Sequence, residues 1–332
     1  MPNDSVSSQN AASDQLHSTK PITILTWNYL GNGLAQTGEF KTDPIFLEWN
    51  YRYPRIVTEI RDIKPDIFSL QEATHSGELA MEFPDYSLFF VPKIQSAALK
   101  GGSPPDGVAV FVDRDRFDVL DVQIVYFKYI GDLTLRYQNA IILTLREVAS
   151  ATTFVLSSTH LKAKSGLEND ALRLHQTEQL ISRLEEQASK LGPETPVIVC
   201  GDFNSTPHQL AYPRIMSSTL NFMSAYNSQP SETGQSNQGA SAGQAAATGH
   251  RYGGGEPAFT TWKFRANEVE KKETIALPSE AQIGPGALPS AAFPSDHLSL
   301  AAQFEFSPPA SAEGQTFPVC ESPQLSSSDG NA

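Results

Sequence analysis

The chain has 332 residues, 39% hydrophobic and 18% charged, which is enough apolar material for one large domain or two small ones. Its 24 basic and 37 acidic side chains give a net charge of −13, which argues against a DNA- or RNA-coating protein with a broad basic surface. No apolar run reaches the ~18 residues of a membrane span, and the N-terminus lacks a signal-peptide core.

The two cysteines predict a reducing compartment. Cys200 lies in the apolar run VIVC, as a buried thiol would, and Cys320 lies in a polar segment. Two cysteines placed in this way do not form a disulfide framework. We therefore expect a cytosolic protein, with the nucleus as a further location.

In chain order, residues 1–20 are polar and predict a disordered tail, and order is expected from Pro21. Runs rich in β-branched and aromatic residues predict strands at 22–28, 65–72, 86–92, 106–112, 117–127, 138–147, 152–161, 195–204, 258–264 and 298–306. Helical spacing predicts helices over 54–64, with Pro54 near the first turn, and over 171–192, with a glycine stop. Residues 30–38 are predicted to be a loop.

Towards the C-terminus the pattern weakens. Residues 228–257 are of low complexity and predict a mobile surface loop, residues 268–294 show no clear strand or helix, and residues 307–332 predict a polar disordered tail. One domain is therefore expected over 21–306. Many strands with few helices indicate a layered α/β or α+β domain built around stacked sheets.

Polar groups recur where predicted strands begin or end: Asn28, Glu72, His160, Asp202 with Asn204, and the pair Asp296-His297 before the last strand. Each has an ordinary explanation as a turn former, an exposed charge or a buried histidine. Asp202 and Asn204 flank Phe203 and would point the same way in an extended chain, which suits a metal or water site. Together, these strand ends predict a functional cleft.

Basic and aromatic side chains stand beside these motifs. Lys93 is in FVPK, and Lys162 and Lys164 are two apart in THLKAK, so they are either phosphate contacts or solvated surface lysines. Trp262 in FTTWK either stacks on a base or ribose or packs in the core.

The motifs TWN, LQE, STHLKAK, GDFNSTP and SDHLSL, in this order, resemble the endonuclease/exonuclease/phosphatase superfamily. PDGVAVF, FTTWK and IGPGALPSAAFPSDHLSL resemble its branch of nocturnin and carbon-catabolite-repressor-type deadenylases. The resemblance implies a DNase I-like, four-layer α/β sandwich with two central, mostly antiparallel sheets flanked by helices. It also implies hydrolysis of phosphoesters with Mg²⁺, for which Mn²⁺ is the alternative.

The resemblance also implies roles near the metal. Glu72 would be the main metal carboxylate, with Asn28 nearby. Asp202 would orient and deprotonate the attacking water, helped by Asn204, and Asp296 would support the metal or the water. Mg²⁺ prefers hard oxygen ligands and keeps several waters, so one or two carboxylates suffice.

The remaining roles concern the substrate. His297 would bond the phosphate oxygens, and His160 would contact the phosphate from the other side. Lys93, Lys162 and Lys164 match basic positions that grip the phosphates of NADP(H), although Lys164 stands where the branch has Arg. Asp106, in PDG, resembles a substrate-side acid of the branch, and Pro-Asp-Gly is also a common turn.

The resemblance leaves three functions open. One is removal of the 2′-phosphate of NADP(H), which the acidic net charge favours, and another is 3′–5′ shortening of poly(A). The third is an inactive or weakly active form that binds nucleotide or a partner, because a T-x-D-Y-I strand expected after Thr274-Ile275 is absent. That loss predicts one or two missing strands, and it removes the acid that normally holds the catalytic histidine.

Overall fold

The computed structural model describes residues 20–37, 40–129, 136–226, 251–252, 256–257, 263–265, 269–274, 277–278, 282 and 288–306. Trp262, residues 1–19, residues 307–332 and most of the low-complexity segment lie outside these ranges, so the predictions for them stay predictions.

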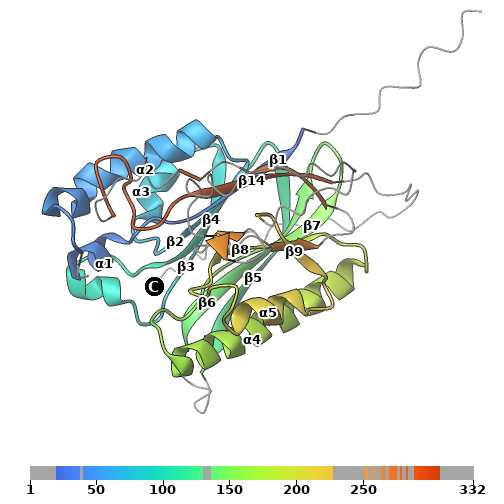
Figure 1. Ribbon diagram of the computed structural model, residues 1–332. Coiled ribbons are helices and arrows are strands. Elements are labelled where there is room, and N and C mark those ends of the chain that lie inside the picture. The colour runs from blue at the N-terminus through green and yellow to red at the C-terminus, as the bar shows by residue number, and fades with distance from the viewer. Residues whose placement is uncertain are drawn as a thin grey trace, which may run out of the picture.

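Two sheets stack face to face in the described part of the chain (Figure 1). The first has the spatial order β13 (Val269–Thr274), β14 (Leu300–Phe306), β1 (Ile22–Asn28), β2 (Ile67–Gln71), β4 (Gly107–Asp113) and β3 (Tyr86–Pro92). The second has the order β5 (Phe117–Lys128), β6 (Arg136–Glu147), β7 (Thr153–His160), β8 (Val197–Asp202), β12 (Lys263–Arg265) and β9 (Phe222–Ser224). A separate pair joins β10 (Arg251–Tyr252) to β11 (Glu256–Pro257).

Helices form the two outer layers. The helices are α1 (Asn32–Thr37), α2 (Trp49–Ile63), α3 (Ser76–Glu82), α4 (Leu167–Leu191) and α5 (Ala211–Met216), with short 3₁₀ turns η1 (Pro44–Leu47) and η2 (Ala97–Gly101). Figure 1 shows α2 and α3 covering the first sheet, and α4 and α5 covering the second. The four-layer sandwich implied by the resemblance is confirmed. No helix in the described ranges is long and apolar enough to cross a membrane.

The strands read as nearly continuous apolar runs because both of their faces are buried. Ile198 and Cys200 of β8 face the other sheet, whereas Val197 and Val199 face α4 and α5. Burying each such side chain stabilises the fold by roughly 1.5–3 kcal/mol. The predicted burial of the Cys200 thiol is confirmed.

Two pairs of neighbouring strands run parallel, and the other pairs are antiparallel. β1 pairs with β2 in parallel, with α2 in the connection, and β7 pairs with β8 in parallel, with α4 as the crossover. The registers place Asn28 opposite Gln71 and His160 opposite Asp202. Since parallel strands end at the same edge, each pair carries its terminal side chains to one end of the sandwich.

Three predictions about the elements are wrong. The predicted loop 30–38 contains α1. Helix α2 begins at Trp49, so Pro54 lies inside it rather than near its first turn, because Trp49 and Tyr53 pack onto the first sheet and extend the helix backwards. The span 268–294 contains the strand β13.

In the region where strands are expected to be missing, the described chain still gives β14 a neighbouring strand. β13 pairs with β14 from Val269, opposite Phe306, to Thr274, opposite Ala302, with an irregularity at Lys271 and Glu273. The polar run VEKKET was not recognised as a strand because backbone pairing, rather than apolar burial, defines an edge strand.

Candidate active site

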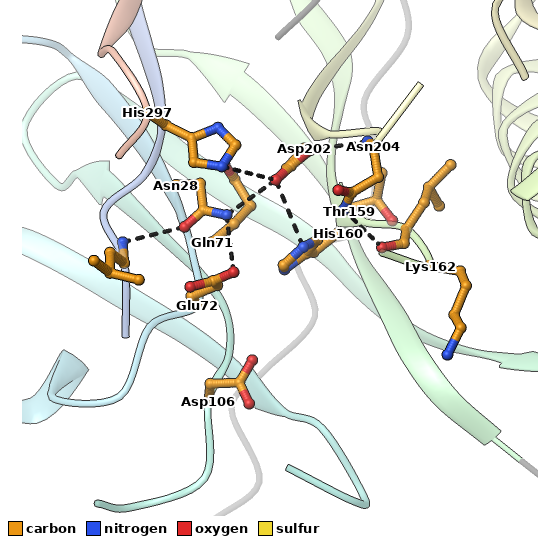
Figure 2. A network of polar contacts seen from close by, with 12 residues as sticks. Asn28, Gln71, Glu72, Asp106, Thr159, His160, Lys162, Asp202, Asn204 and His297 are labelled. Atoms are coloured by element: carbon orange, nitrogen blue, oxygen red, sulfur yellow. Dashed lines mark hydrogen bonds and ion pairs between the residues drawn. The ribbon is translucent and has the colours of Figure 1, made fainter. Parts of the chain in front are cut away.

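Five side chains that the sequence places at strand ends meet at one end of the sandwich. Asn28, His160 and Asp202 are the last residues of their strands, Glu72 directly follows β2, and His297 lies in the loop before β14. We call these five the strand-end cluster. Figure 2 shows them converging from the two sheets, with Asp202 between the two histidines and Asn28. The structure thus brings together side chains that lie far apart in the sequence (Figure 2).

Asp202 connects three other members of the cluster. Its Oδ2 accepts a hydrogen bond from Nδ2 of Asn28 at 2.9 Å and lies 3.6 Å from Nε2 of His160 and 3.9 Å from Nε2 of His297. Its Oδ1 accepts the backbone N–H of Asn204 at 2.9 Å. Burial raises the pKa of Asp202, but the two histidines and these hydrogen bonds outweigh it and hold that pKa below its usual value. Asp202 is therefore a carboxylate at neutral pH.

Glu72 lies on the side of the cluster that belongs to the first sheet. Its Oε1 accepts from Nδ2 of Asn28 at 3.1 Å, and its Oε2 accepts from the backbone N–H of Gly31 at 3.2 Å. Glu72 has a φ of 57°, and a Cβ on Gly31 would lie 2.7 Å from its carbonyl oxygen, so only glycine fits there. Burial, together with the charge of Asp296, raises the pKa of Glu72.

The pKa values of the two histidines are shifted in opposite directions. Burial and the charge of Lys93 lower the pKa of His160 to about 4, so its imidazole is neutral. Lys93 can only donate, and its Nζ is 3.4 Å from Nδ1 of His160, so the proton of this ring is on Nε2 and faces Asp202. Burial lowers the pKa of His297, but Asp202, Asp296 and Glu72 outweigh it, and that pKa is raised.

Lys93 and Asp106 form a buried pair beside His160. Nζ of Lys93 lies 2.6 Å from Oδ2 of Asp106, whose Oδ1 accepts from the hydroxyl of Ser96 at 2.5 Å. The Asp106 residue is only 1% exposed. Asp106 is therefore held by Lys93 and Ser96, and its predicted role on the substrate side stays a prediction.

Lys162 and Lys164 lie in the loop after β7. Lys162 is half-buried and lies on the side of the cluster away from Glu72 (Figure 2), and Lys164 is exposed with a φ of 79°. In the part of the chain that the structure describes, neither ammonium group forms an ion pair. Asn204 has a φ of 47°, so the extended geometry expected for it is wrong, and its Nδ2 donates to the carbonyl of Leu161 at 3.1 Å.

Two residues that were not predicted fix the backbone of the cluster. The hydroxyl of Ser295 donates to the carbonyl of Asn28 at 2.7 Å and accepts the N–H of His297 at 3.2 Å. Nε1 of Trp27 donates to the carbonyl of His297 at 2.9 Å. Among the described residues, no carboxylate is hydrogen bonded to Nδ1 of His297, so these backbone contacts are what hold it.

Arg52 is a third residue that was missed. It is fully buried in α2, and its Nη1 donates to the carbonyls of Tyr29 at 3.0 Å, Leu30 at 2.8 Å and Pro294 at 3.4 Å. Burial lowers the pKa of Arg52 to about 10, so it stays charged at neutral pH. Arg52 thus ties the loop after Asn28 to the loop that carries Asp296 and His297.

Comparison with known proteins agrees with this fold and these motifs. The model of the Endonuclease/Exonuclease/phosphatase family matches residues 25–268. The chain belongs to this family. Nocturnin of Xenopus laevis is 32% identical, with 86% of this chain and 73% of that protein covered. Human nocturnin is also 32% identical, with 86% of this chain covered, but this chain spans only 65% of its length.

Solved structures of family members give the same picture. The catalytic domain of human nocturnin with bound sulfate anion superposes with a TM-score of 0.66 at 29% identity, over 86% of this chain and 95% of that one. ANGEL2, a 2′,3′-cyclic phosphatase in complex with adenosine-2′,3′-vanadate, has a TM-score of 0.68 at 20% identity over the same shares, which shows the common fold. The nocturnin and ANGEL members of the family are phosphoesterases or nucleases.

Enzymes of this family generally depend on a divalent metal ion, and the donor set here fits one. Burial and, to a smaller extent, the charge of the exposed Asp296 raise the pKa of Glu72, and a hard cation would stabilise both carboxylates. No group of three or more His, Cys, Asp or Glu side chains in the described ranges is arranged to hold a metal alone. The Oδ1 of Asn28 already accepts the backbone N–H of Leu30 at 3.1 Å. Its Nδ2 donates to both Glu72 and Asp202, so in this arrangement Asn28 bridges these two acids.

Proposed function

We propose that this chain is a Mg²⁺-dependent phosphoester hydrolase that removes the 2′-phosphate of NADP(H). The observation that carries the proposal is the position of Asp202, an ionised carboxylate within 3.9 Å of a neutral and of a more basic imidazole. That arrangement offers Asp202 to orient water, with His160 holding Asp202, and His297 to contact a phosphate. The nocturnin relatives support a nucleotide substrate, and the ammonium groups of Lys162 and Lys164, which form no ion pair with a described residue, support one with more than one phosphate.

The side chains of the strand-end cluster and Asp296 would have different roles in the reaction. Glu72 would hold Mg²⁺, with Asp296 as a further oxygen donor, and when bound the ion supplies Lewis-acid stabilisation of the phosphoryl charge. Asp202 orients the attacking water and accepts its proton at Oδ2 while the new P–O bond forms and the bond to the 2′-oxygen breaks. The imidazole of His297 donates to the phosphate oxygens as their charge grows, whereas the N–H of His160 stays on Asp202.

A second candidate function is 3′–5′ removal of AMP from poly(A). It is supported by a relative named carbon catabolite repressor protein 4 homolog 3, from Arabidopsis thaliana, which is 30% identical over 66% of this chain and 50% of its own length. The same strand-end cluster would act on either phosphoester. The net charge of −13 favours the small substrate, because a long RNA needs a wider basic surface.

Purified protein with Mg²⁺ should be given NADPH and oligo(A) in separate reactions. We expect phosphate and NADH from the first and no AMP from the second. AMP release without phosphate release from NADPH would replace the proposal by the exonuclease. Adenosine 2′,3′-cyclic phosphate is a useful third substrate, because the ANGEL2 structure is described as that of a 2′,3′-cyclic phosphatase.

The third candidate, an inactive form, is tested with the same protein. Glu72→Gln removes the charge proposed to hold the metal, and Glu78→Gln in α3 is the matched control outside the strand-end cluster. Turnover that Glu72→Gln abolishes and Glu78→Gln preserves excludes the inactive form. A folded wild-type protein without turnover on any of the three substrates would support it.

A further inference from the structure

Two side chains of α4 form hydrogen bonds to the backbone of residues 161–165, which we call the lysine loop. Arg173, which is 1% exposed, donates from Nη1 to the carbonyl of Lys162 at 3.1 Å and to the carbonyl of Lys164 at 2.8 Å. One helical turn further, Oε1 of Gln176 accepts the backbone N–H of Lys162 at 2.9 Å. These are side-chain bonds to backbone, so they act on the loop whatever side chains it carries.

Both groups are themselves fixed. Nη2 of Arg173 is 3.5 Å from Oδ1 of Asp170 in the same helix, and Nε2 of Gln176 donates to Oε1 of Gln138 in β6 at 2.9 Å. Burial of a guanidinium is costly, and the hydrogen bonds of Nη1 offset part of that cost, which favours keeping Arg173 at these carbonyls. The single nitrogen Nη1 reaches both ends of the Lys162–Lys164 tripeptide.

Residues Asp202 and Asn204 form hydrogen bonds to the start of the lysine loop. The N–H of Leu161 donates to the carbonyl of Asp202 at 2.9 Å, and its carbonyl accepts from Asn204 at 3.1 Å. Lys164 keeps a left-handed φ of 79°, a conformation that a non-glycine residue holds only where its surroundings impose it. The backbone is thus fixed, while the two lysine side chains carry charge without an ion pair in the described ranges.

We propose that Arg173 and Gln176 are positioning residues that set the spacing of the Lys162 and Lys164 ammonium groups. The fixed spacing selects nucleotides that carry phosphate at two separate places over nucleotides with a single phosphate. A flexible lysine pays conformational entropy when it binds an anion, and a fixed backbone limits that cost. This inference rests on the proposed phosphatase function and adds a reason for its substrate preference.

The first test does not depend on activity. Hydrogen exchange of the Lys162 amide is measured in the full chain, in Arg173→Met, in Gln176→Met and in the control Arg183→Met, whose side chain is 56% exposed on the same helix. We expect exchange at Lys162 to rise by about tenfold or more in the first two variants, as for a lost hydrogen bond to a charged or buried group. Leu180 in the middle of α4 should stay protected. Unchanged exchange at Lys162 in both variants would overturn the proposal.

The second test is a comparison of KM and kcat. With NADPH, KM should rise about tenfold in Arg173→Met, kcat should change by less than about threefold, and Arg173→Lys should recover part of the loss. With adenosine 2′-monophosphate, KM should change clearly less. Equal changes for the two substrates, or a loss confined to kcat, would contradict the inference. If the wild type hydrolyses neither substrate, the proposed function fails, and the exchange data still decide whether α4 holds the loop. If Arg173→Met does not fold, Gln176→Met takes its place.

Discussion

Replacing His160 by Gln should remove a specific acid sensitivity of the metal-free protein. The pKa of this buried histidine is lowered from 6.5 to about 4, so as pH falls the unfolded chain takes up the proton before the folded one does. Stability from this group is therefore fully present above about pH 6.5 and is lost as pH falls towards 4. At pH 5 the protein lies about 1.5 pH units inside this window, which corresponds to about 2 kcal/mol.

The assay is urea unfolding of wild type and His160→Gln in EDTA, at pH 8 and at pH 5. Groups far from His160 titrate alike in both proteins, so the difference between the two free energies reports on His160 together with Asp202, which is coupled to it. We expect wild type to lose about 2 kcal/mol more than the variant between these pH values. A difference that does not depend on pH, or a histidine NMR titration that places His160 near 6.5, would refute the assignment of a neutral imidazole.

Three further outcomes follow from the contacts. Arg52→Met should cost about 3 kcal/mol in urea unfolding, since the carbonyls that Nη1 serves lose their donor, whereas the exposed Arg61→Met should cost under about 1 kcal/mol. Gly31→Ala should lower kcat by about tenfold or more at little cost in overall fold, because its Cβ displaces Glu72; an unchanged kcat would contradict the contact. Burial raises the pKa of Cys200 to about 12, so in a Cys320→Ser background a thiol reagent at pH 8 should label Cys200 only after unfolding, and rapid native labelling would contradict this.

Most of the sheet framework could be predicted because its strands are buried on both faces. β3 was located to the residue, and β4 through β8 to within a few residues, since each is a β-rich run bounded by turns. β13 could not be predicted, because VEKKET has no apolar face and becomes a strand only by pairing with β14. Helix α2 began five residues early because aromatic packing against the first sheet outweighs the signal of Pro54.

The site was predictable wherever chemistry coincided with a strand end. The residues that fix its backbone were harder to find, but not equally so. Arg52 lies four and eight residues before Ile56 and Ile60, so it belongs to the apolar stripe of α2, and a charge on that stripe indicates a buried arginine. Ser295 gave no such signal, because its two hydrogen bonds depend on how distant loops meet.

The two parallel β–α–β units support the site through the same kind of contact. In each parallel unit, an arginine in the first half of the crossover helix donates to carbonyls of the loop that follows the first strand, Arg52 after β1 and Arg173 after β7. A crossover helix has to pass over the end of the first strand of its parallel pair. Its first turns therefore lie where a long side chain such as arginine can donate to the loop after that strand. The two arginines support different groups, since Arg52 holds the backbone around Asn28 and His297, and Arg173 holds the lysines. Loss of Arg52 should therefore lower kcat for every substrate alike, whereas loss of Arg173 should raise KM according to the number of phosphates. The same kinetic effect in both variants would mean that the two arginines only stabilise the fold.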